Sequence, residues 1–506
     1  MNTADTTYGA TPKRFQMPLC DRTVTTELSN DYTLPDYQPE IRRILRVGTT
    51  VIPPAKYIGG SNAEFNGNID YNLLYVGADG ALYSAPLSAE YAFSAPLELS
   101  NEFDLNEGVI VLCDSMDESV TVRVSAPRKL SIKCRLVSRV RAYGMMLSEE
   151  RCVGECNPMS IERFMGECQV NKTLAALGET IECSDEIALS DDELRVISAT
   201  ADANISELSP SEGYLNCRGE ATLKMIICRD NDPSTAETMI KKFPFSEQLE
   251  FDDLTPDAAC RGTAYVSDIS ISVEDGRILC NLSIIPELTA HIQRPMSYTR
   301  DLYSTEKHCE SAYREYILPR VCCISGANFS QSERIPLSDT TIKQGSRIVD
   351  LWCKPYAEKA ELERNKYCIS GQCKYTFLLE NEGDYSTAEL MIPLRYEFEG
   401  SASVPESFMA DIGVISCRAR IDGGNVGIDT ELSVCADIYG SERITALSDV
   451  RFGDNVERGD GDIVICFPSP DDTAWSVSKK YFVPVSKISG VSSPDDSLSG
   501  YVVINK

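Results

Sequence analysis

The sequence predicts a mainly β protein with three repeated antiparallel domains, of sandwich or barrel type, and a small α/β domain at its C-terminal end. Two observations carry this prediction. Strand-like alternation of apolar and polar residues recurs at a fixed interval of 152 residues, beginning at Gly67, Gly219 and Gly371. The last part of the chain instead has a strand–helix–helix–strand pattern that is not repeated elsewhere.

The repeated stretch has the period-2 pattern of a half-buried strand. Its apolar positions are Ile69, Tyr71, Leu73 and Tyr75 in the first copy, Ala221, Leu223, Met225 and Ile227 in the second, and Cys373, Tyr375, Phe377 and Leu379 in the third. The period is far longer than that of a solenoid repeat, so each copy is expected to be a domain in its own right.

The domain borders follow from this register. Residues 1–30 are expected to form an N-terminal arm or a leading strand. The repeats are assigned to residues 31–165, 166–325 and 326–456, and a turn-rich linker to residues 457–462.

One short helix is expected near the start of the first repeat. Ile41, Ile44 and Leu45 follow Pro39 with the spacing of one apolar helix face, and proline is favoured in the first helical turn. After the strand that begins at Gly67, the pair Asp79-Gly80 predicts a tight hairpin turn.

The C-terminal domain, residues 463–506, is expected to have a βααβ order. Its first strand begins at Ile463, and Asp472 or Thr473 can cap a helix that carries Trp475 and Tyr481. A second short helix is expected from residue 485, and residues 501–504 have the composition of a closing strand.

The overall composition is that of a folded, acidic protein. Of 506 residues, 42% are hydrophobic and 25% are charged, and the net charge is −29. Such a charge argues against binding to nucleic acid or to an anionic membrane surface. No apolar run approaches the roughly 20 residues that span a bilayer. The first residues lack the basic start and apolar core of a signal peptide, so we expect no export by the general route.

The 20 cysteines are expected to be free thiols that act as small apolar residues in a reducing compartment. Most of them lie singly in strand-like segments, Cys322 and Cys323 are adjacent, and no Cys-x-x-Cys occurs. The chain has two histidines, His291 and His308, so a zinc site or a histidine-activated nucleophile is poorly supplied. Later oxidative cross-linking is the alternative.

No motif nominates an enzyme. The sequence has no Gly-x-x-x-x-Gly-Lys-Ser/Thr phosphate loop and no Gly-x-Ser-x-Gly elbow. Carboxylate pairs such as Asp191/Asp192 are expected by chance in so acidic a chain and are read as solvated surface. We therefore expect no catalytic residue, no metal and no cofactor.

Two segments resemble known families. Residues 34–47, the strand at 67–75 and Phe93-Ser94 resemble the SPOCS domain (DUF3794) of spore coat proteins. Residues 470–481, with the closing strand, resemble a LysM module, whose usual opening is Gly-Asp-Thr-Leu-Trp-x-Ile-Ala-x-x-Tyr. This chain departs from that opening at Asp471, Ala474 and Ser478.

Three SPOCS-like repeats before one LysM-like module resemble the SpoIVA-interacting coat proteins of clostridial spore formers. The resemblance implies a structural adaptor in the mother-cell cytoplasm, at the forespore surface, that docks through its LysM-like module on SpoIVA, the ATPase of the coat basement layer. The SPOCS repeats would be scaffold or would bind other coat proteins or a second copy. No direct membrane insertion is implied.

Trp475, Lys479, Lys480 and Tyr481 are the candidate docking residues by this resemblance. Trp475 and Tyr481 can equally belong to the core of a small module, and the lysines can be solvated. The alternative function is binding of peptidoglycan or cortex glycan by the LysM-like module, although peptidoglycan lies outside the mother-cell cytoplasm. A third alternative is a hydrolase or redox enzyme hidden in the cysteine-rich repeats.

Overall fold

Antiparallel strands form most of the chain in the computed structural model, in which 78% of residues are strand and the described residues contain one short α-helix. The structure describes residues 13–100, 102–103, 108–188, 194–229, 232–274, 276–400, 404–457, 461 and 463–505. The mainly β class predicted from the sequence is therefore confirmed. Residues 1–12 of the expected arm and residues 458–460 and 462 of the expected linker lie outside the described residues.

The first group of strands forms two facing sheets. One has the order β1-β7-β6, and in the other β2, β3 and β5 all pair with β4. The bounds are β1 Lys13–Thr33, β2 Ile41–Val51, β3 Ala55–Gly59, β4 Asn62–Gly77, β5 Leu82–Pro96, β6 Val109–Ala126 and β7 Lys129–Ser148. The alternating residues of β4 that include Ile69 and Tyr71 are buried against Ile132 and Leu136 of β7, as their period-2 pattern predicts.

The second group has the same order of strands along the chain, but a single residue pair joins its strands into one seven-stranded sheet. Its strands are β9 Ile161–Leu177, β10 Ile181–Ala188, β11 Leu194–Ser211, β12 Tyr214–Arg229, β13 Asp232–Glu250, β14 Ala259–Glu274 and β15 Arg277–Ser304. The central strand β12 pairs with β11 and β13 and packs on β15, so that Leu223 and Met225 share a core with Cys280 and Leu282. The connection from β7 contains β8, Arg151–Val153, and the 3-10 turn η2, Pro158–Ser160.

The third group has the sheets β17-β18-β19 and β16-β21-β20, with β8 pairing parallel to β21. Its elements are β16 Lys307–Pro336, the 3-10 turn η3 Leu337–Asp339, β17 Arg347–Glu363, β18 Lys366–Asn381, β19 Asp384–Glu399, β20 Ser407–Asp422 and β21 Asn425–Asn455. Tyr375 and Phe377 of β18 pack against Val426 and Leu432 of β21. The strands that carry the repeat, β4, β12 and β18, thus occupy the same place in each group.

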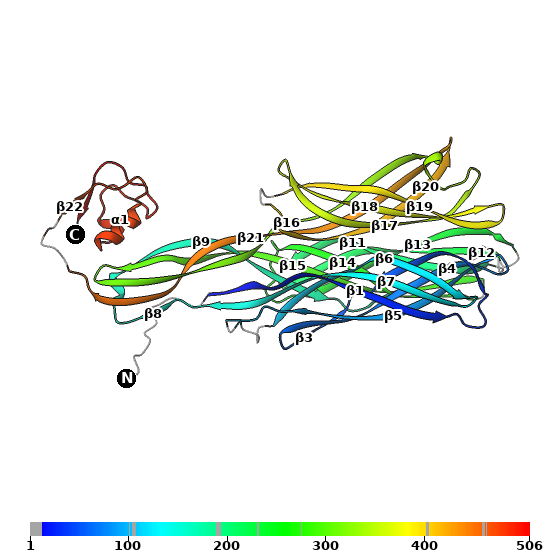
Figure 1. Cartoon of the computed structure of the whole chain (residues 1–506), viewed down its shortest axis with the longest axis horizontal. Helices are drawn as coiled ribbons and strands as arrows, with labels where there is room; N and C mark the ends of the chain where they lie inside the picture. The colour runs from blue at the N-terminus through cyan, green and yellow to red at the C-terminus, as the bar shows by residue number, and fades with distance from the viewer. Residues whose placement is uncertain are drawn as a thin grey trace.

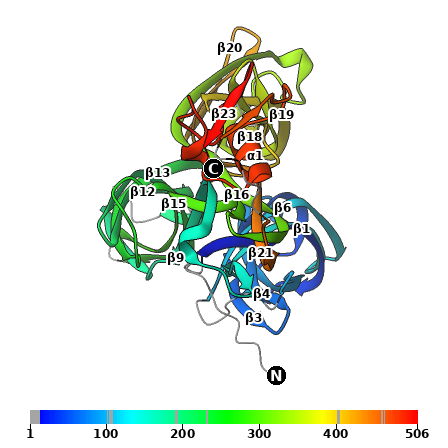
Figure 2. The same cartoon turned by 90° about the vertical axis from the view of Figure 1, so that its left-hand side faces the viewer.

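The three groups surround a common centre (Figure 2). One buried cluster joins them, and it contains residues spaced by the repeat of 152: Leu45, Ile197 and Val349 form one such set, and Leu74, Ile226 and Leu378 form another. Equivalent residues therefore meet at a pseudo-threefold axis. The arrangement is a closed ring of three units rather than a linear row, because each unit contributes the same positions to the shared core.

Polar contacts at neighbouring strands join each pair of units. Asn72 Nδ2 donates to the carbonyl of Ala199 at 3.2 Å, and Lys224, the equivalent residue in the second unit, pairs with Asp350 at 2.9 Å. Between the third and first units, Thr387 Oγ1 donates to the carbonyl of Leu45 at 3.2 Å. These contacts fix the rotation of each unit relative to the next.

The prediction of a short helix after Pro39 is wrong, because residues 41–51 form strand β2. Two register shifts, at Ile41/Arg43 and Ile44/Arg46, interrupt its alternation. Each bulge adds one residue, so Ile41 and Ile44 both face the core of the first unit although they are three residues apart. Leu45 points to the opposite side, into the core between units. The spacing of Ile41, Ile44 and Leu45 in this bulged strand is therefore the same as that of one apolar face of a helix.

Long strands extend from the body towards the C-terminal module (Figure 1). This stalk contains the last part of β15, the first part of β16 and the paired parts of β9 and β21. Phe15 and Met146 of the first unit pack there against Cys168, Tyr316 and Ile444. The module lies at the far end of the stalk, away from the three-unit body.

Candidate partner-docking site in the C-terminal module

The C-terminal module comprises β22 Ile463–Cys466, α1 Ala474–Tyr481, the 3-10 turn η4 Val485–Lys487 and β23 Val502–Asn505. The expected βααβ order is wrong, because the second helix is a single 3-10 turn. The chain leaves this turn at once for the sheet: Ile488 bridges to Ile504, and the Ser489 N–H donates to the carbonyl of Val503 at 2.9 Å. These bonds stop the helix after one turn.

A capping box starts α1 at Thr473. The Thr473 hydroxyl accepts from the Ser476 N–H at 3.2 Å, and the Ser476 hydroxyl accepts from the Thr473 N–H at 3.0 Å. Of the two predicted caps, Thr473 is the one used. Phe482 ends the helix with a left-handed φ of 54°. Val477 then packs on the inner residues of the two strands, Cys466, Val502 and Ile504.

Trp475 and Lys479 lie one turn apart on the helix and face the end of β15. Trp475 Nε1 donates to Oδ2 of Asp301 at 2.8 Å, and Lys479 Nζ lies 2.7 Å from both carboxylate oxygens of Asp301. The Trp475 ring packs against Tyr303, at 4.9 Å between centroids, and against Phe164, at 5.2 Å. Trp475 is 6% exposed. We call this contact the Asp301 clamp.

The Asp301 carboxylate has a further donor in the stalk, since the Tyr313 hydroxyl of β16 donates to Oδ1 at 2.6 Å. Burial acts to raise the pKa of Asp301. The hydrogen bonds from Lys479, Trp475 and Tyr313 outweigh burial, so the pKa lies below its ordinary value and the carboxylate stays charged.

Three further contacts beside the Asp301 clamp join the module to the stalk. The Tyr303 hydroxyl donates to the carbonyl of Val483 at 2.6 Å, and Arg300 lies 3.7 Å from Asp495. The rings of His308 and Phe482 meet edge to face at 5.1 Å. His308 thus lies at the border of module and stalk.

Lys480 and Tyr481 do not join Trp475 and Lys479 at the clamp. Lys480 is exposed, with Nζ 5.8 Å from the centroid of the Tyr481 ring. Tyr481 packs on the core of the module. Of the four predicted docking residues, Trp475 and Lys479 thus make an internal contact, Lys480 is exposed to solvent, and Tyr481 packs on the module core.

A surface that the sequence reasoning missed lies on the outer side of the two-stranded sheet. Ile463 and Ile465 of β22 are 63% and 60% exposed, Phe467 directly after the strand is 79% exposed, and Tyr501 directly before β23 is 67% exposed. Because Cys466 pairs with Val502, Tyr501 lies beside Phe467. We call these four residues the β22 apolar face. The run from Ile463 to Phe467 is wholly apolar, so no polar contrast indicated which side is covered.

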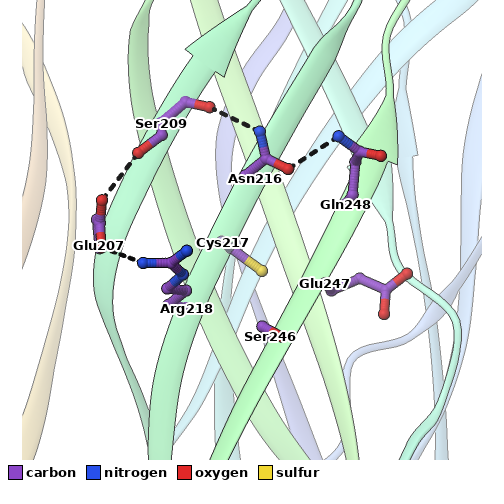
Figure 3. Close-up of a pocket in the computed structure, with 8 residues that line it drawn as sticks. All are labelled: Glu207, Ser209, Asn216, Cys217, Arg218, Ser246, Glu247 and Gln248. Atoms are coloured by element: carbon purple, nitrogen blue, oxygen red, sulfur yellow. Dashed lines mark hydrogen bonds and ion pairs between the residues drawn. The ribbon is translucent and has the colours of Figure 1, made fainter.

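A hollow lies elsewhere, on the outer surface of β11, β12 and β13, and has a volume of about 380 Å³ (Figure 3). Several of its polar side chains bond to one another: Gln248 donates to Asn216 at 2.9 Å, and Ser209 donates to Glu207 at 3.1 Å. Its thiol, Cys217, is 1% exposed, and burial raises its pKa. The Cys217 thiol therefore lacks the exposure and the lowered pKa of an activated nucleophile.

The 20 cysteines are free in the structure. Among the described residues, no group of three or more histidine, cysteine, aspartate or glutamate side chains is arranged to hold a metal ion. No helix in the described part of the chain has the length and apolar character needed to span a membrane.

Comparison with known proteins gave no match: no family model fits the chain, and no curated protein or solved structure is significantly similar to it.

Proposed function

We propose that this protein is a non-enzymatic structural adaptor in endospore coat assembly, of the SipL-like, SpoIVA-interacting class. It docks through the C-terminal module on the SpoIVA-type ATPase of the coat basement layer, in the mother-cell cytoplasm at the forespore surface. The family assignment rests on the sequence resemblance. The single structural observation that supports protein docking is the β22 apolar face, four large apolar side chains exposed on one side of a small module.

The position of this face suits docking. The module lies at one end of the long axis, so a partner can reach it without meeting the three-unit body (Figure 1). Each large apolar side chain that a partner fully covers contributes about 1.5–3 kcal/mol. No described strand pairs with the outer edge of β22, so a partner strand can also add to the sheet there.

The body supplies a rigid support for the module. Its units bury equivalent faces against one another, and Leu74, Ile226 and Leu378 are almost fully buried at their junction. In this proposal the SPOCS-like repeats act as scaffold, while their outer strands remain for other coat proteins or a second copy.

A pair of charged substitutions tests the proposal. The full chain with Ile465→Asp and Phe467→Asp should lose binding to the purified SpoIVA-type ATPase by about 100-fold or more, since charged groups would have to be buried at the interface. Val404→Asp is the matched control, because Val404 is 73% exposed outside the module. If the double variant binds as tightly as the unchanged chain, the β22 apolar face is not the docking surface.

A further inference from the structure

The Asp301 clamp holds two of the four residues that the sequence resemblance nominates for docking, Trp475 and Lys479. Trp475 is 6% exposed, and the side chains of Asp301 and Lys479 are 18% and 36% exposed. An external protein cannot contact the indole N–H of Trp475 while Asp301 accepts it. The contact is therefore internal to the chain and mutually exclusive with any external contact through the same atoms.

The clamp joins two parts that share no sheet. Strands β22 and β23 pair only with each other among the described strands, and the stalk strand β21 ends at Asn455. The module has its own core, built from residues that include Val477, Ile488 and Ile504. Separating module from stalk therefore breaks side-chain contacts and the bond from Tyr303 to the Val483 carbonyl, but no strand pairing.

The chemistry of the clamp defines what displaces it. The stalk presents one carboxylate, Asp301, beside the aromatic rings of Tyr303 and Phe164. The module presents an indole N–H and an ammonium group four residues apart. A competing surface must likewise offer a carboxylate next to an apolar or aromatic side chain, because an unpaired Lys479 and a bare indole would lose their bonds without compensation.

We propose that the Asp301 clamp is a closed state of the C-terminal module, and that a partner protein binds the Trp475–Lys479 face by replacing Asp301 and Tyr303 with its own carboxylate and apolar side chain. This proposal rests on the proposed function, and it separates two surfaces. The β22 apolar face is open at all times, whereas the Trp475–Lys479 face becomes available only when the clamp opens.

Closure sets the apparent affinity of any partner that uses the covered face. That affinity is reduced by the fraction of molecules that are open, so a clamp closed in nine molecules of ten weakens binding about tenfold. Weakening the clamp should correspondingly strengthen binding to the partner, which is the reverse of the usual effect of removing a contact residue.

The first measurement follows the clamp without any partner. The chain has two tryptophans, so Trp352→Phe leaves Trp475 as the only indole reporter. In that background, Asp301→Asn and Tyr303→Phe should each shift Trp475 emission to longer wavelength and increase its quenching by acrylamide. Asp384→Asn is the matched control, since Asp384 pairs with Arg43 at 2.8 Å far from the module. Equal quenching of Trp475 with and without Asp301→Asn, in the Trp352→Phe chain, would contradict the proposal that Asp301 holds Trp475 in a closed state.

Lys479→Met provides a second route if one of the stalk variants folds poorly. Asp301 and Lys479 act on the same contact, so Asp301→Asn combined with Lys479→Met should expose Trp475 no more than the stronger single change does. Fully additive increases in quenching would show that the two side chains do not act as a pair and would contradict the proposal.

The second measurement titrates the full chain with the purified SpoIVA-type ATPase. Asp301→Asn should bind about tenfold more tightly than the unchanged chain, and Asp384→Asn should bind equally. If the quenching shows release of Trp475 but affinity is unchanged, gating is refuted and docking through another face stands. If neither chain binds the ATPase, the proposed function fails, and the quenching result still decides the clamp.

Discussion

Trp475 and Asp301 are 174 residues apart in sequence, and the indole N–H of the first donates to the carboxylate of the second at 2.8 Å. Trp475, which was predicted to dock an external partner, therefore takes part in an internal contact. It also makes the carboxylate of Asp301 one of the groups that hold the module on the stalk.

Acid should open the clamp. The pKa of Asp301 lies below its ordinary value of 3.8, so its ionised form contributes stability above that value, and this contribution is lost as pH falls through the lower, folded pKa. In the Trp352→Phe chain, Trp475 emission should therefore stay constant between about pH 5 and 8 and change only in stronger acid. Asp301→Asn should show no such acid step. A step near neutral pH would contradict this assignment.

Gly371→Ala should destabilise the protein by about 1–3 kcal/mol. A Cβ at this position would overlap the carbonyl oxygen of Tyr356, which a register shift in β17 brings close to β18. Gly219 has the same relationship to the carbonyl of Asn204. Urea unfolding measures the change. The control is Gly326→Ala in β16, where an added Cβ meets no atom within 4 Å. Equal midpoints for the two variants would contradict the packing described.

Leu378→Ala should cost about 2–5 kcal/mol of unfolding free energy, because it leaves a cavity where the three units meet. Leu74→Ala should have a similar effect, since Leu74 occupies the equivalent position in the first unit. Denaturant unfolding again provides the measurement. Met159→Ala is the control, because the Met159 side chain is 89% exposed. A cost below about 0.5 kcal/mol would mean that the units do not pack on a shared core.

Thr473→Ala should weaken the module alone, by about 1 kcal/mol, because it removes the hydroxyl that accepts from the Ser476 N–H. Amide hydrogen exchange should become faster in α1 and stay unchanged in β4, β12 and β18. Uniformly faster exchange would show instead that module and body unfold as one unit.

The repeat and its strands could be predicted because their signals are local. The alternation after Gly67, Gly219 and Gly371 reports directly which residues face each core, and the common interval places those strands at equivalent positions. The bulges in β2 could not be predicted, because an added residue gives Ile41 and Ile44 a helix-like spacing in a strand.

The junction of the units and the docking surface needed three-dimensional information. Leu74 and Leu45 read as ordinary apolar residues, and only the ring of units shows that they face a neighbouring unit. Trp475 was expected at an external docking face or in the core of the module, and the sequence contains no signal that pairs it with Asp301. The exposed face of β22 could not be predicted from the run that begins at Ile463, because the residues on both sides of the strand are apolar.

The most direct test of the proposed function is a binding titration of the purified SpoIVA-type ATPase with the full chain and with the chain lacking residues 463–506. A parallel titration with chitin oligomers and cortex glycan tests the alternative. We predict saturable binding of the ATPase by the full chain, its loss in the truncated chain, and no saturable glycan binding. Equal binding of the ATPase by both chains, or glycan binding that requires residues 463–506, would contradict the proposal.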